Sequence, residues 1–124
     1  PNTGELCKLL NVEWLDKNEL PDAAQQAISD GLAGIVAVSM GAEGAWLVSQ
    51  DKRYFVEAPS VEKRSTVGAG DSMVAGITHS LLNNMTLREA IRFGVACGSA
   101  ATMNEGTQLF HKEDAERLVS QINE

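Results

Sequence analysis

A short apolar run in the first half of the chain constrains the fold most strongly. Residues 34–39 (Gly-Ile-Val-Ala-Val-Ser) have the length of a strand and no polar alternation, which is typical of a buried strand in a parallel sheet. Apolar residues at helical spacing precede this run over residues 3–11 and 21–33, and they follow it from residue 73 onward. The alternation of helices and strands therefore predicts an α/β layered fold with parallel strands.

Further elements follow the same logic. Strands are expected at 45–49 and 53–57, joined by a tight turn as a hairpin. Thr86 and Glu89 form a T-x-x-E capping box ahead of a helix that runs to about residue 104. Because many residues of this helix are glycine or alanine, we expect it to pack closely on a neighbour. A last amphipathic helix is expected near 112–122.

Charge and length exclude several classes of protein. The 124 residues suit one domain, and the net charge of −7 argues against nucleic-acid or anionic-membrane binding through a broad basic surface. No apolar run approaches the roughly 18 residues of a membrane span, and no signal-peptide pattern opens the sequence, so we expect a cytoplasmic protein. Cys7 and Cys97 lack any metal or disulfide spacing and are expected to be buried thiols.

The segment from Gly68 to Asp71 (Gly-Ala-Gly-Asp) carries the strongest chemical signal. It precedes an apolar run with helical spacing, so it predicts a glycine-rich turn that leads into a helix N-terminus. Free backbone amides and the helix dipole at such a point favour an anion, and Asp71 would lie in the first helical turn beside it. An anion site next to a carboxylate suggests phosphoryl transfer. The alternative is a capping aspartate after a flexible loop.

Two other segments are candidates for the same kind of site. Residues 39–44 (Ser-Met-Gly-Ala-Glu-Gly) follow the buried strand, where ligands of open α/β sheets usually bind, although a hairpin turn without a ligand explains them too. Asn2 and Glu5 place an amide and a carboxylate at a helix start, and such oxygen donors suit Mg²⁺ beside a phosphate. Capping of that helix explains the same pair equally well.

The order of these motifs is more specific than any one of them. N-x-x-E at 2–5, S-x-G-x-x-G at 39–44, S-T-V-G-A-G-D-S at 65–72 and A-A-T-M-N-E-G-T at 100–107 together span the chain. In this arrangement the sequence resembles the C-terminal half of the ribokinase-like, pfkB-type sugar kinases, most closely their minor-type bacterial 6-phosphofructokinases. The resemblance implies the C-terminal part of a Rossmann-type three-layer α/β fold, with parallel strands plus a hairpin, flanked by helices.

The resemblance also implies roles for individual residues. Asp71 matches the family's catalytic base, and the amides of Gly68, Ala69 and Gly70 match its anion hole. Glu5 matches the family's magnesium-linked acid. The positions that match the ATP site are Asn2, Ser39, Met40, Gly41, Ala42, Glu43, Gly44, Lys63, Val95, Ser99 and Asn104. Those that match the potassium site of K⁺-activated members are Ser65, Val67, Ala101, Asn104, Gly106 and Gln108.

The implied activity is ATP-dependent phosphorylation of a sugar-phosphate hydroxyl, with fructose 6-phosphate as the expected acceptor. A 1-phosphofructokinase or a tagatose 6-phosphate kinase would share all of these residues. A noncatalytic nucleotide-binding module and a structural domain without a ligand are alternatives from other classes.

One departure from the family is large. The N-terminal half of the family's sheet and its β lid have no counterpart in these residues, so we expect a C-terminal fragment of a larger chain that catalyses poorly alone. An unpaired sheet edge and an exposed apolar face would favour a homo-oligomer or association with the missing half.

Overall fold

The computed structural model describes residues 1–106 and 108–122, so Thr107 of the last family motif lies outside the described residues. Two short 3₁₀ turns, η1 (Lys17–Glu19) and η2 (Gly41–Glu43), accompany the main elements. In chain order these are α1 (Thr3–Leu9), α2 (Leu20–Ser29), β1 (Val36–Ser39), β2 (Ala45–Val48), β3 (Arg53–Val56), α3 (Ala69–Leu82), α4 (Leu87–Thr102) and α5 (Lys112–Val119).

The sheet corrects one expectation. Its strands run in the order β1-β2-β3 and each neighbouring pair is antiparallel, with Val36 opposite Val48 and Ala45 opposite Val56. The five residues between β1 and β2 are far too few for the crossover that parallel neighbours require. Among the described residues, parallel pairing is limited to one bridge, between Asn2 and Ser39. The predicted hairpin of β2 and β3 is confirmed.

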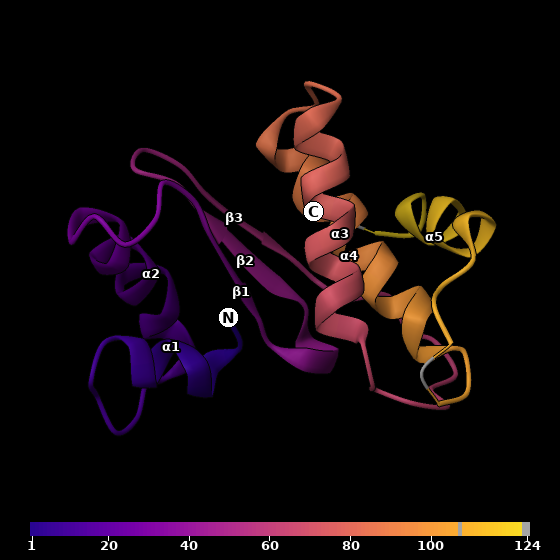
Figure 1. Cartoon of the computed structure of the whole chain (residues 1–124), viewed down its shortest axis with the longest axis horizontal. Helices are drawn as coiled ribbons and strands as arrows, with labels where there is room; N and C mark the ends of the chain where they lie inside the picture. Colours follow the sequence, from indigo (N-terminus) through magenta and orange to yellow (C-terminus); the bar gives the residue numbers. More distant parts are fainter. Residues whose placement is uncertain (107, 123–124) are drawn as a thin grey trace.

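Two layers of helices explain why Val36, Ala37 and Val38 of β1 are all apolar. Val36 and Val38 pack with α1 and α2 on one face of the sheet, whereas Ala37 contributes to the core on the opposite face. On that opposite face, Leu47 and Val56 pack against α3 and α4. Figure 1 shows the sheet between α1 and α2 on one side and α3 and α4 on the other. A three-layer α/β arrangement is therefore present, although the strands are not parallel.

Small residues bring α3 and α4 close together, as expected. A Cβ built on Gly94 would lie 2.5 Å from Cγ1 of Ile77, and one on Gly76 would lie 2.8 Å from Sγ of Cys97. The α4 N-terminus is fixed by the predicted capping box, in which Glu89 N donates to Thr86 Oγ1 at 3.2 Å and Thr86 N donates to the Glu89 carboxylate at 2.8 Å. These contacts hold the two longest helices at a fixed spacing.

The remaining helices are shorter than their apolar patterns suggest. The expected helix at 3–11 ends at Leu9, because Asn11 takes a left-handed φ of 55°. The expected helix at 21–33 ends at Ser29, and Gly31 takes a φ of 77° while Leu32 N donates to the carbonyl of Ala27. Within the described ranges, no helix is long and apolar enough to cross a bilayer.

Candidate functional site

The glycine turn begins α3 as the sequence predicts. Gly68 is the N-cap residue with a left-handed φ of 80°, and Ser72 N donates the first helical hydrogen bond to its carbonyl at 2.9 Å. No side chain in the described part of the chain caps this terminus. Of the predicted anion-hole amides, Ala69 N already donates to the carbonyl of Thr66 at 3.3 Å, whereas the first-turn amides of Gly70 and Asp71 point away from the helix, beside the exposed Asp71 side chain. Such an arrangement attracts an anion.

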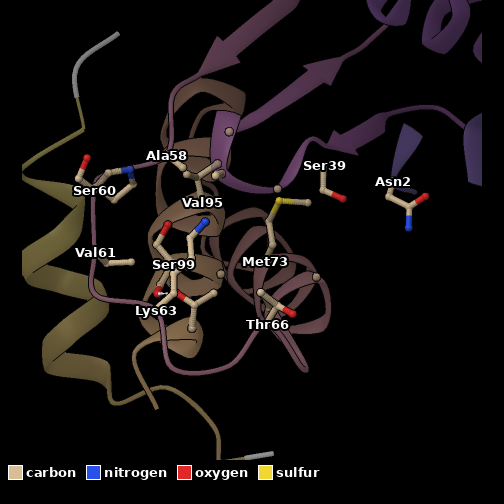
Figure 2. Close-up of a pocket in the computed structure, with 18 residues that line it drawn as sticks. Asn2, Ser39, Ala58, Ser60, Val61, Lys63, Thr66, Met73, Val95 and Ser99 are labelled. Atoms are coloured by element: carbon tan, nitrogen blue, oxygen red, sulfur yellow. Dashed lines mark hydrogen bonds between the residues drawn. The ribbon is translucent and has the colours of Figure 1, made fainter. Parts of the chain in front are cut away.

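A pocket of about 550 Å³ lies directly beside this turn. As Figure 2 shows, α4 contributes Val95 and Ser99, α3 contributes Met73, and Ser39 and Asn2 lie across the pocket from α4. Ala69 and Gly70 of the α3 N-terminus line it as well. Of its lining residues in the described ranges, Lys63 alone carries a charged side chain. The walls thus combine an apolar surface with backbone donors, which suits a flat ring attached to an anionic group.

The turn after β1 forms another wall and is fixed by its own backbone. Met40 N donates to the carbonyl of Gly44 at 2.9 Å. Gly44 takes a φ of 117°, and a Cβ on it would lie 2.0 Å from the carbonyl oxygen of Val56, so only glycine fits there. Gly41, Ala42 and Gly44 line the pocket as a result. The hairpin alternative and the ligand-binding interpretation of this turn are geometrically compatible.

Asn2 and Glu5 form a complete capping box at α1. Glu5 N donates to Asn2 Oδ1 and Asn2 N donates to Glu5 Oε2, both at 2.9 Å. Ser39 N donates to the carbonyl of Pro1, which holds the start of the chain beside β1 and places Asn2 at the pocket. The expected capping alternative is therefore realised. The cap uses Oε2 of Glu5, and Oε1 takes no part in it. The role of Glu5 toward magnesium stays a prediction.

The segment before the glycine turn is held against the end of α4. Arg64 N and Ser65 N both donate to the carbonyl of Thr102, at 2.7 and 3.2 Å. Ser65 Oγ donates to the carbonyl of Gly106 at 3.0 Å and accepts from Val67 N at 3.2 Å. Three of the residues assigned to potassium, Ser65, Val67 and Gly106, are thereby brought together next to the α3 N-terminus.

The other three positions assigned to potassium lie around the same loop. Ala101 is buried in α4, and its carbonyl accepts from Asn104 N at 3.3 Å. Asn104 Nδ2 donates to the carbonyl of Leu109 at 3.1 Å, and Gln108 N donates to the carbonyl of Glu105 at 3.3 Å. These carbonyl groups accept hydrogen bonds within the chain, so the potassium assignment stays a prediction. Among the described residues, no cluster of three or more His, Cys, Asp or Glu side chains could hold a metal ion.

The structure brings most of the predicted site together around the pocket. The predicted residues that line it are Asn2, Ser39, Gly41, Ala42, Gly44, Lys63, Ala69, Gly70, Val95 and Ser99. The remaining nucleotide positions lie elsewhere: Met40 packs against the core on the α2 side, Glu43 pairs with Lys17, and Asn104 faces Leu109. Gly68 and Asp71 do not line the pocket, although they are the sequence neighbours of its lining residues Ala69 and Gly70.

Sequence reasoning missed several lining residues, which are Ala58, Pro59, Ser60, Val61, Thr66, Met73, Gly98 and Thr102. Helical spacing would have found two of them, because Gly98 and Thr102 lie three and seven residues after Val95 on one face of α4. The segment 58–61 has no comparable signal, since it follows β3 as irregular chain.

Comparisons with known proteins agree with this geometry. The family model described as "pfkB family carbohydrate kinase" matches residues 1–114. ATP-dependent 6-phosphofructokinase isozyme 2 of Escherichia coli K12 is 42% identical over 123 residues, which cover 99% of this chain and 40% of that protein. A 1-phosphofructokinase of Borreliella burgdorferi is 31% identical over 98% of this chain and 39% of its own length.

A solved structure gives the same result in three dimensions. The crystal structure of E. coli phosphofructokinase-2 in complex with potassium superimposes with a TM-score of 0.92 at 43% identity. The match covers 98% of this chain and 39% of that one. The chain thus spans about 40% of the length of the relatives that it matches. With a family model that matches nearly the whole sequence, the chain belongs to the pfkB family of carbohydrate kinases.

Proposed function

We propose that this chain forms the ATP-binding and phosphoryl-transfer half of a sugar-phosphate kinase, with fructose 6-phosphate as the acceptor. The observation that carries the proposal is the position of Gly70, which lines the pocket and also belongs to the α3 N-terminus beside Asp71. A nucleotide in this pocket would have its terminal phosphate at the free amides of α3. The acceptor hydroxyl would then approach from the side of Asp71.

The chemistry asks mainly for positioning and charge stabilisation. The acceptor oxygen attacks the γ-phosphorus, the bond from that phosphorus to the β–γ bridging oxygen breaks, and ADP leaves. Asp71 accepts the proton of the acceptor hydroxyl as the new P–O bond forms. The amides of Gly70 and Asp71, together with the positive end of the α3 dipole, stabilise the negative charge on the transferred group. The acceptor itself must be held by residues outside this chain.

Two cations fit the residues present. Asn2 lines the pocket, and Glu5 beside it in the cap carries a carboxylate whose Oε1 is not used by that cap; a carboxylate oxygen is a ligand that Mg²⁺ prefers. Ser65 and Gly106 bring oxygens together next to the α3 N-terminus, and the potassium complex of the E. coli relative supports a monovalent site there. When bound, these cations would offset the negative charge of the triphosphate.

The acceptor is the least constrained part of the proposal. The relatives of this chain include both a 6-phosphofructokinase and a 1-phosphofructokinase, and a tagatose 6-phosphate kinase is expected to share the site residues as well. The greater identity to the 6-phosphofructokinase favours fructose 6-phosphate. The described residues provide no wall opposite Asp71, whose side chain is exposed, so acceptor choice lies in the rest of a complete enzyme.

A chimaeric enzyme tests the proposal directly. This chain would replace the matching 40% of E. coli 6-phosphofructokinase isozyme 2, and phosphorylation of fructose 6-phosphate, fructose 1-phosphate and tagatose 6-phosphate would be measured. We expect ATP-dependent turnover that is lost when Asp71 is changed to asparagine. A folded chimaera that binds MgATP but transfers no faster than its Asp71→Asn variant would contradict a catalytic role and favour a nucleotide-binding module.

A further inference from the structure

The turn that forms one wall of the pocket carries an acidic side chain that a distant lysine neutralises. Glu43 lies in η2, between the pocket-lining residues Ala42 and Gly44. Its Oε2 accepts from Nζ of Lys17 at 3.0 Å, although the two residues are 26 positions apart. We propose that Lys17 is an electrostatic positioning residue, which cancels the charge of Glu43 so that the turn tolerates an anionic nucleotide. This inference rests on the proposed function.

A capped 3₁₀ turn holds Lys17 in this position. It is the first residue of η1, whose N-cap is Asp16. The Asp16 side chain accepts from Asn18 N at 3.0 Å, and its carbonyl accepts from Glu19 N at 2.9 Å. The backbone that carries the lysine is therefore fixed independently of Glu43.

The position of Lys17 relative to the pocket is equally informative. It borders a hollow of about 330 Å³ together with Asn2, Ser39 and Gly41, which also line the main pocket. Glu43 lines this hollow as well, so the ion pair borders the turn that forms one wall of the main pocket. In the proposed function, a charge on this turn would act on a polyphosphate bound in that pocket.

The ion pair contributes little to the stability of the fold. The side chains of Lys17 and Glu43 are 64% and 58% exposed, and ion pairs this exposed contribute little to folding because solvent screens them and their side chains lose entropy on pairing. The turn itself is already fixed by the Met40–Gly44 hydrogen bond and by the close approach of Gly44 to Val56. The ion pair therefore changes the net charge of the turn and has little influence on its shape.

The charge balance of the molecule makes this neutralisation matter. The chain has a net charge of −7, and in the described ranges Lys63 is the only charged residue that lines the pocket. An uncompensated carboxylate on the turn would repel the triphosphate, an effect of about three- to tenfold in affinity at low salt for unit charges several ångströms apart in water. Removing the carboxylate should therefore strengthen the binding of the triphosphate.

The experiment is a double-mutant cycle on MgATP affinity, measured by titration calorimetry on the 124-residue chain at low salt. Lys17→Met should weaken binding about three- to tenfold, whereas Glu43→Gln should tighten it. The combined variant should bind within about twofold of the parent chain. Lys52→Met, at the exposed tip of the β2–β3 hairpin, is the matched control and should leave affinity unchanged. The Lys17 effect should shrink in 0.5 M salt, on the order expected from screening, and urea midpoints should agree among all variants.

The possible outcomes separate this inference from the proposed function. Equal weakening by Lys17→Met, Glu43→Gln and the combined variant would mean that the pair only supports the turn mechanically, and the inference would be wrong. An unchanged affinity in Lys17→Met would also overturn it while leaving the proposed function intact. A folded parent chain that does not bind MgATP would overturn the proposed function and this inference together.

Discussion

The two faces of helix α3 differ sharply in how far their side chains are buried. The inner face packs against α4 through Met73, Gly76 and Ile77, all of which are buried. The outer face carries Asp71 and a line of apolar side chains, of which Val74 is 57% exposed and Leu82 is 77% exposed. One helix thus packs in the core on one side and exposes apolar side chains on the other.

This difference separates the two halves of the proposed reaction. The inner face belongs to the layer that builds the nucleotide pocket, and its packing is complete within the described residues. The outer face begins at Asp71, where the acceptor would approach, and contiguous exposed apolar groups of this kind mark a surface that another body covers. In the proposed function, the chain would therefore provide the nucleotide site and leave the acceptor site open to the rest of a complete enzyme.

The largest expected effect comes from removing the carboxylate of Asp71 on the outer face. In the chimaeric enzyme, Asp71→Asn should lower kcat about 100- to 10,000-fold with little change in ATP affinity, because the base acts only in the transfer step. Steady-state kinetics and nucleotide titration would check both parts. A fall in kcat of less than about tenfold would remove Asp71 from the reaction.

A smaller effect is expected when the close packing of the inner face of α3 against α4 is disrupted. Gly94→Ala would place a Cβ 2.5 Å from Cγ1 of Ile77 and 3.0 Å from the carbonyl oxygen of Met73, so α3 and α4 must separate. We expect a loss of about 1–3 kcal/mol in the free energy of unfolding, partly offset by the better helix propensity of alanine. Urea denaturation would measure it. Gly34→Ala, whose Cβ meets open space, is the control and should stay within about 0.5 kcal/mol of the parent chain.

The contact of α4 with α3 also predicts a dependence of stability on pH, through Cys97 of α4. Burial raises the pKa of the Cys97 thiol from 9.0 to about 12. Between these values the unfolded thiol ionises while the folded one keeps its proton, so stability should fall as the pH rises from about 9, by at most roughly 1.4 kcal/mol per pH unit. Cys97→Ala should give a flatter profile over this range. Equal slopes for the two proteins would show that the thiol is accessible to solvent in the folded state.

The smallest effect on stability comes from the apolar outer face. Replacing Val74 and Leu82 with glutamine should change the free energy of unfolding by no more than about 0.5 kcal/mol per site, because neither side chain is packed. The same change should reduce self-association of the isolated chain, measured by sedimentation at increasing concentration. Self-association that is unaffected by the double variant would direct attention to the free edge of β1 instead.

The sequence predicts the helices and the site motifs better than it predicts the sheet. The N-terminus of α3 follows from Gly68 and Asp71, and the thin α4 follows from its glycines and alanines. The apolar run predicts a buried strand at 34–39; the strand covers only 36–39, and Gly34 and Ile35 are exposed. For the residues that do form the strand, helices on both faces bury an antiparallel strand just as well as a parallel one. Apolar patterning alone therefore does not determine strand direction, which here follows from the short connection between β1 and β2.

The pocket shows a second limit of sequence reasoning. Val95 and Ser99 are predictable from motif and helical spacing, whereas the segment 58–61 lines the pocket as irregular chain. Its residues carry no motif because their position depends on the course of the backbone after β3. Glu43 illustrates the reverse case: it lies within a nucleotide motif, yet its side chain pairs with Lys17 and does not line the pocket.

The aromatic pair on the sheet makes the nucleotide turn observable by spectroscopy. Trp46 follows Gly44 by two residues and packs against Phe55 with ring centroids 5.2 Å apart, so its fluorescence should respond when the turn changes environment. Trp14, the other tryptophan, is 71% exposed and would contribute a nearly constant, red-shifted background. A Trp14→Phe variant would leave Trp46 as the single tryptophan, beside the proposed ATP site, and excitation of tryptophan alone would then allow stopped-flow measurement of nucleotide arrival without an attached dye.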